Sequence, residues 1–205
     1  MTERKLDSYK FRLFSVNVYR KLFPASKCLF MYRDIMELAK STYRLTMVLP
    51  SVRLVYLLGK LSGQLTKIMI DTMGFDGSDF CERVDNGLML GVFLSAMTTT
   101  SYLNMRQRGF DVRALSYEEL VARPLDMCRV ILEFCNLPVS LAELAVRAFD
   151  VDSQRNCVQA KSVIGHFKEP QMTPQIQAKL NSLLERFGLP LIGEPGIIEG
   201  SLTCS

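Results

Sequence analysis

The stretch CLFMYRDIMELAKSTYRL, Cys28 to Leu45, decides how this chain is expected to fold. A continuous apolar run from Lys27 to Arg33 is typical of a strand covered on both faces of a parallel sheet. Residues at helical spacing follow from Ile35 to Tyr43, with Asp34 at the helix start. The stretch therefore predicts a buried strand that leads directly into a helix.

The same order of elements recurs later in the chain. FDVRALSY (Phe110–Tyr117) predicts a second strand, and Pro124 suits the first position of a helix after it. SLAE (Ser140–Glu143) has the pattern of a capping box, and a last helix is predicted to begin at TPQ (Thr173–Gln175) and to end at Gly188. Strand and helix in alternation predict an α/β fold with a parallel sheet.

Composition narrows the classes of function. The chain has 205 residues, which is enough for one domain with a core, and a net charge of +4. Its Lys and Arg residues are scattered rather than clustered, which excludes the basic stripe of a nucleic-acid binder and favours small anions. The six cysteines form no CxxC pair, so we expect free thiols, a reducing compartment and no metal site.

One stretch, GLMLGVFLSAMTTTSYLNM (Gly87–Met105), is apolar enough to raise the question of a membrane span. Threonine, serine and asparagine dilute its second half, so a buried core helix is the preferred interpretation. The N-terminus lacks the apolar run of a signal peptide. We expect a cytoplasmic protein, with the Golgi as the alternative if a membrane anchor precedes Met1.

Arg33 and Ser41 are the first candidate site residues. Ser41 lies two helical turns beyond Asp34, so its hydroxyl can return to the face beside Arg33. A guanidinium and a hydroxyl at a strand's carboxyl end make a phosphate clamp. The alternative is an arginine paired with Asp34 or Glu37 and a serine that faces solvent.

Three segments resemble the sulfotransferases that use 3′-phosphoadenosine 5′-phosphosulfate (PAPS). KLFPASKCLFMYRDIMELAKSTYRL (Lys21–Leu45) resembles their 3′-phosphate segment, in which a strand ends in Arg and a Ser follows eight residues later. LSYEELVARPLDMCRVILEFCNLPVS (Leu115–Ser140) resembles their strand with a Tyr-Glu-Asp-Leu type motif. KSVIGHFKEPQMTPQ (Lys161–Gln175) is similar to their late glycine-containing phosphate loop. Arg33 and Ser41 match the two 3′-phosphate positions.

The other matches assign further residues to the same cofactor. Tyr117 matches the aromatic residue near the adenine, and Lys161, Gly165 and Lys168 match the late loop, where Ser162 replaces a glycine. The resemblance thus implies PAPS bound by Arg33, Ser41, Tyr117, Lys161 and Ser162. It also implies a three-layer fold, with a parallel sheet between helices, over residues 1–192, followed by a flexible tail at 193–205.

The implied activity is transfer of a sulfuryl group from PAPS to a hydroxyl or amine of a small-molecule or carbohydrate acceptor. The family's 5′-phosphosulfate loop and first strand have no match in this chain, and no residue matches the usual histidine base. The catalytic residue therefore stays unassigned, and His166 is interpreted as an exposed loop residue. The alternative function is an inactive, truncated relative that binds nucleotide or a partner, and an unpaired sheet edge would favour self-association.

Overall fold

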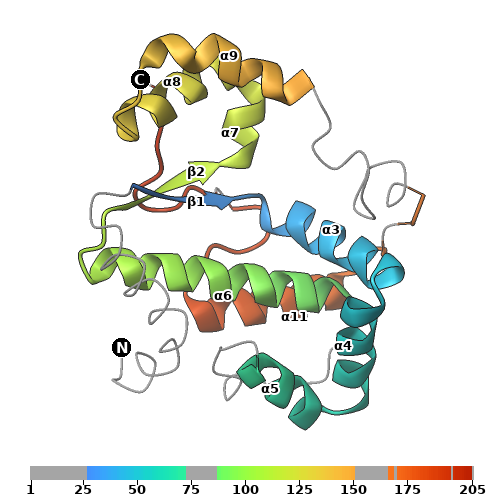
Figure 1. Cartoon of the computed structure of the whole chain (residues 1–205). Coiled ribbons are helices and arrows are strands. Elements are labelled where there is room, and N and C mark those ends of the chain that lie inside the picture. The colour runs from blue at the N-terminus through green and yellow to red at the C-terminus, as the bar shows by residue number, and fades with distance from the viewer. Residues whose placement is uncertain (1–26, 73–86, 151–165, 169, 195, 205) are drawn as a thin grey trace.

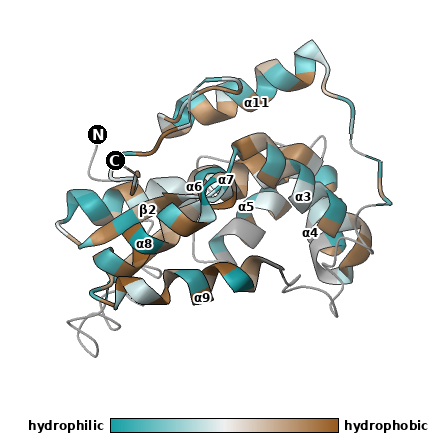
Figure 2. Ribbon diagram, turned by 90° about the horizontal axis from the view of Figure 1, so that it is seen from above, coloured by the Kyte–Doolittle hydropathy of each residue, from teal (hydrophilic) through white to brown (hydrophobic). Residues whose placement is uncertain are grey.

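A computed structural model describes residues 27–72, 87–150, 166–168, 170–194 and 196–204. In chain order the elements are β1 (Cys28–Tyr32), α3 (Ile35–Val48), α4 (Pro50–Leu61), α5 (Gly63–Thr72), α6 (Gly87–Gln107), β2 (Val112–Ser116), α7 (Tyr117–Ala122), α8 (Pro124–Phe134), η2 (Val139–Leu141), α9 (Ala142–Val146), η3 (Arg147–Asp150) and α11 (Pro174–Phe187). The described part is mostly helical, with a small parallel sheet, and both predicted strands are present. Figures 1 and 2 show α11 and α9 on opposite sides of the molecule.

The sheet brings together two strands that lie far apart in the sequence. β1 and β2 pair in parallel, in a register that runs from Cys28 opposite Val112 to Tyr32 opposite Ser116. Within the described residues β1 pairs with no other strand. The alternate side chains Leu29 and Met31 on β1 are exposed. Both strands end at the same edge, so the residues that follow them are neighbours.

The last described residues run along the other side of β2. The N–H of Ala114 donates to the carbonyl of Gly200 at 3.1 Å, and the N–H of Leu202 donates to the carbonyl of Ala114 at 2.8 Å. The Tyr102 hydroxyl on α6 donates to the carbonyl of Glu199 at 2.8 Å. The sequence predicted a flexible tail over residues 193–205. In the structure, residues 198–202 lie along β2, with backbone hydrogen bonds to Ala114 and a hydrogen bond from the Tyr102 hydroxyl.

α6 (Gly87–Gln107) is the buried centre of the fold, as the sequence predicts for this apolar stretch. α3 crosses it so closely that a Cβ atom on Gly91 would lie 2.5 Å from the Cα of Ala39. Two polar residues of α6 bond locally: the Thr98 hydroxyl donates to the carbonyl of Leu94 at 3.0 Å, and the Ser101 hydroxyl donates to the carbonyl of Met97 at 2.8 Å. None of the described helices combines the length and the apolar character that a membrane crossing requires.

Local signals placed most helix ends correctly. Asp34 caps α3, and the Thr173 hydroxyl caps α11, which ends at Gly188 in a left-handed conformation with φ of 64°. The predicted capping box at Ser140 is wrong. Pro138 leads into the short 3-10 turn η2, which contains Ser140, so α9 starts after Leu141 without a side-chain cap.

Candidate site at the carboxyl edge of the sheet

Arg33 and Tyr117 meet where the two parallel strands end. Each is the first residue after its strand, and the preceding residues, Tyr32 and Ser116, are register partners. The guanidinium carbon of Arg33 lies 4.9 Å from the centroid of the Tyr117 ring, within cation–π range. Tyr117 is 37% exposed, so part of its side chain is accessible to a ligand. The fold thus brings together two of the five predicted site residues.

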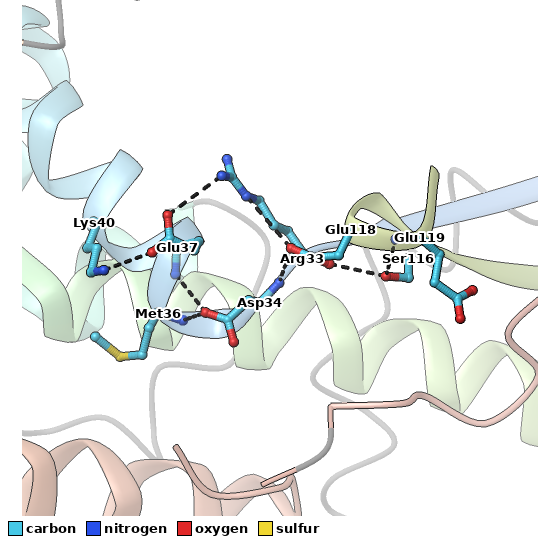
Figure 3. A network of polar contacts seen from close by, with 8 residues as sticks. All are labelled: Arg33, Asp34, Met36, Glu37, Lys40, Ser116, Glu118 and Glu119. Atoms are coloured by element: carbon cyan, nitrogen blue, oxygen red, sulfur yellow. Dashed lines mark hydrogen bonds and ion pairs between the residues drawn. The ribbon is translucent and has the colours of Figure 1, made fainter. Parts of the chain in front are cut away.

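The Arg33 guanidinium also contacts two carboxylates. Its Nη2 lies 3.7 Å from Oε2 of Glu37, and its Nε lies 3.9 Å from Oε1 of Glu118 (Figure 3). The sequence left open whether Arg33 pairs with Asp34 or with Glu37, and in the structure it pairs with Glu37. Nε of Arg33 is buried and makes no hydrogen bond in the described part of the chain. Arg33 therefore retains a donor that a phosphate oxygen could use.

Glu118 links the ends of the two strands. Its Oε1 accepts a hydrogen bond from the N–H of Asp34 at 2.9 Å, and its Oε2 accepts one from the Ser116 hydroxyl at 3.1 Å. The Ser116 hydroxyl in turn accepts from the N–H of Glu119 at 3.3 Å and caps α7. Sequence reasoning missed Glu118, whose only signal was its position directly after Tyr117.

Glu37 remains negatively charged in this network over a wide range of pH. A hydrogen bond from Lys40, 2.8 Å long, lowers the pKa of Glu37 below its ordinary value, with help from the charges of Lys40, Arg33 and Arg44, although burial opposes the shift. Since the carboxyl is ionised at neutral pH, it partly neutralises Arg33. An incoming phosphate would have to compete with Glu37.

The remaining predicted site residues are not gathered at Arg33. Ser41 is half-buried on α3, and no hydrogen bond between its hydroxyl and Arg33 is present in the described residues. Lys161 and Ser162 lie outside the described residues. His166, the only histidine, is exposed in a turn, as expected, and Lys168 is exposed too.

A cavity of about 460 Å³ opens at the same edge of the sheet. The junctions β1–α3 and β2–α7 form one wall, and α6, the end of α11 and the segment from Gly188 to Thr203 form the others. Arg33 is the only Lys or Arg among the described residues that line it. The carboxylates in its lining belong to Asp34, Glu118, Glu119, Glu194 and Glu199.

Comparisons with known proteins identify no relative of this chain. No protein-family model matches the chain, and neither the curated proteins nor the solved structures include a significant match.

Proposed function

We propose that this chain belongs to the PAPS-dependent sulfotransferases and binds the 3′-phosphoadenosine part of that cofactor at the carboxyl edge of the sheet. One observation carries the proposal: the guanidinium of Arg33 lies on the ring of Tyr117. These two residues come from segments that separately resemble the family's 3′-phosphate and adenine positions. Their contact depends on parallel pairing of β1 and β2, which neither segment specifies alone.

Each residue has a role that its chemistry supports. Arg33 offers its buried, unbonded Nε and its charge to the 3′-phosphate, because a guanidinium fork matches phosphate oxygens. Tyr117 provides an exposed aromatic face for the adenine. Ser41, Lys161 and Ser162 complete the phosphate site in this proposal. The wider three-layer arrangement of a sulfotransferase belongs to the same proposal.

The reaction proposed is an in-line attack of an acceptor hydroxyl or amine on the sulfur of the bound cofactor. PAPS supplies the activated sulfuryl group, and the chain's basic residues hold and neutralise the bisphosphate that leaves. Arg33 fixes the 3′-phosphate and so orients the nucleotide. The cavity carboxylates do not suit the 5′-phosphosulfate, since they would repel an anion.

A second function, nucleotide binding without turnover, is favoured by the position of the histidine. A general base for this chemistry needs a pKa near neutral pH and a place beside the acceptor. The only imidazole of the chain belongs to His166, which is exposed in a turn and does not line the cavity. The chain would then act as an adenosine-bisphosphate binding module.

Calorimetric titration with 3′,5′-adenosine bisphosphate tests the shared part of both functions. We expect micromolar binding by the full chain. Arg33→Ala should weaken it by about 10- to 100-fold, because a charge-assisted hydrogen bond contributes about 1.5–3 kcal/mol. Ser41→Ala should cause a smaller loss. Arg129→Ala on α8 is the control, since that arginine is also exposed and pairs with a nearby carboxylate, Asp126, at 3.6 Å.

The titration has outcomes that decide between the functions. Loss of binding in Arg33→Ala, with Arg129→Ala unchanged, supports the clamp. Sulfuryl transfer from radiolabelled PAPS to a panel of phenols, sugars and amines then separates the enzyme from the binding module. Failure of the folded wild-type chain to bind the bisphosphate would refute both functions.

A further inference from the structure

The 460 Å³ cavity has the dimensions and the apolar lining of a small-molecule site. Leu103 of α6, Leu184 of α11, Leu189 and Ile198 contribute apolar side chains to its lining. Two of them, Leu184 and Leu189, are buried, so this part of the lining belongs to the core. The cavity can therefore accept an apolar body.

The charge of the lining opposes binding of an anion. The one basic side chain of the described lining, Arg33, is already paired with Glu37 and Glu118. The lining contains five acidic side chains: Asp34, Glu118, Glu119, Glu194 and Glu199. Several of these carboxylates already accept bonds within the protein: Asp34 caps α3, Glu118 links the strand ends, and Glu194 accepts from the N–H of Leu191 at 2.8 Å. A concentration of negative charge in a hollow raises the local concentration of cations.

Glu119 is the carboxylate that lacks a complete set of partners. Its Oε2 is buried and accepts no hydrogen bond in the described part of the chain. In Figure 3 its carboxylate points away from the Arg33 guanidinium, to the opposite side of the strand ends. A buried carboxylate oxygen without a donor is costly, so a donor supplied by a ligand would be favourable.

Thr99 provides a second, independent polar group in the cavity lining. It lies on α6, is only 6% exposed, and its hydroxyl makes no hydrogen bond within the residues described here. Its neighbour Thr98 shows the usual alternative, because that hydroxyl donates to the backbone carbonyls of Leu94 and Ser95. The Thr99 hydroxyl is thus a donor and acceptor in the cavity lining that a ligand can use.

We propose that the cavity binds a small organic cation, an ammonium group on an apolar body. The ammonium donates to the buried oxygen of Glu119, and the Thr99 hydroxyl makes a further polar contact with the ligand. The apolar body packs against Leu103, Leu184 and Ile198. This inference does not rest on the proposed nucleotide clamp, because Glu119 and Thr99 have no role there, although Arg33 lines the same cavity.

Calorimetry with three ligands of equal chain length tests the proposal. Decylammonium, 1-decanol and decanoate, each used below its aggregation limit, share a ten-carbon chain and carry a positive, a neutral and a negative polar group respectively. We expect decylammonium to bind at least about tenfold more tightly than decanoate, with decanol between them. The reason is that the acidic lining attracts a cation and repels an anion in a partly desolvated site.

Variants assign the binding to this cavity. Glu119→Gln keeps the shape and removes the charge, and should weaken decylammonium binding by about tenfold, with less effect on decanol. Thr99→Val should weaken it by a few fold. Glu185→Gln, on the exposed face of α11, is the matched control and should change nothing.

The result can overturn the proposal without affecting the nucleotide clamp. Equal affinity for decylammonium and decanoate, or equal effects of Glu119→Gln and Glu185→Gln, would refute the cation site. Thermal melts of each variant show whether it is folded before it is titrated. A parallel titration with 3′,5′-adenosine bisphosphate on the same samples reports on the clamp separately, so either site can fail alone.

Discussion

Arg33 has more than one partner, and its charge is shared among them. Its guanidinium stacks on Tyr117 while two carboxylates lie 3.7 Å and 3.9 Å away. The three side chains are each more than one-third exposed, so these ion pairs are weakly stabilising and are screened by salt. A phosphate with two charges can therefore displace them, at a modest loss of affinity.

At the residue scale we predict that Glu118→Gln increases the affinity for 3′,5′-adenosine bisphosphate. The amide oxygen can still accept from the N–H of Asp34, while the competing charge near Arg33 is gone. We expect a gain of up to about fivefold, since an exposed pair contributes about 0.2–1 kcal/mol. Calorimetric titration measures it.

Glu119→Gln is the control for this prediction. It removes the same charge one residue further along α7, where the side chain points away from Arg33 (Figure 3). A gain in both variants would indicate a general field effect of the acidic edge. No gain in Glu118→Gln would mean that Glu118 does not compete for the guanidinium.

At the scale of elements, the contact between α3 and α6 sets the position of Arg33. α3 begins directly after the β1–α3 junction, and its buried Ala39 lies against Gly91 of α6. Small residues at the crossing allow the two backbones to approach closely. Tyr43, one turn further along α3, lies with its ring against Gly87, which is one turn earlier along α6.

We predict that Gly91→Ala lowers the free energy of unfolding by up to about 2 kcal/mol. The added methyl group would meet the backbone of Ala39 at 2.5 Å, which neither helix can relieve by moving a side chain. Overpacking of this kind costs about 1–3 kcal/mol, partly offset by the better helix propensity of alanine. Urea denaturation measures the change.

Gly196→Ala is the matched substitution, because a Cβ at Gly196 meets no atom within 4 Å. It should leave the urea midpoint nearly unchanged. An equal or higher stability of Gly91→Ala would show that α3 and α6 can separate at little cost, and that the crossing does not fix Arg33.

At the scale of the whole molecule, β1 forms one edge of the sheet among the residues that the structure describes. Within the described residues it pairs only with β2, while residues 198–202 cover the other side of β2. Leu29 is 38% exposed and Met31 is 53% exposed on this strand. An apolar edge strand with unpaired backbone groups is a template for association with another chain.

We therefore predict concentration-dependent self-association through β1, measured by sedimentation velocity. Met31→Lys should shift the chain toward the monomer, because a charged side chain on an edge strand disfavours pairing. Leu144→Lys on α9 is the control, since Leu144 is also exposed, at 63%, but lies on a helix. A monomeric wild-type chain, or equal shifts in both variants, would contradict the prediction.

The features that the sequence predicted well are local. The apolar run before Arg33, the caps at Asp34 and Thr173 and the stop at Gly188 each depend on a few neighbouring residues. Ser140 was misplaced because Pro138 starts a 3-10 turn that interrupts the capping pattern.

The site was harder to predict because its contacts are distant in sequence. Glu118 reaches Arg33 only through the register of β1 and β2, and no pattern within either strand sets that register. The pairing of residues 198–202 with β2 was missed for a similar reason, since that segment has no alternation of apolar and polar residues.

The sheet register also has a consequence for the kinetics of folding. Partners across the strand ends, such as Asp34 and Glu118, stand 84 positions apart, and pairings of such separation close slowly. Arg33 and Tyr117 come together only with this closure, and we predict that the closure follows the folding transition state, so that a nucleotide held by both residues does not bind that state. Such a ligand would leave the refolding rate unchanged and slow unfolding. It would prolong the lifetime of the folded chain without speeding its formation.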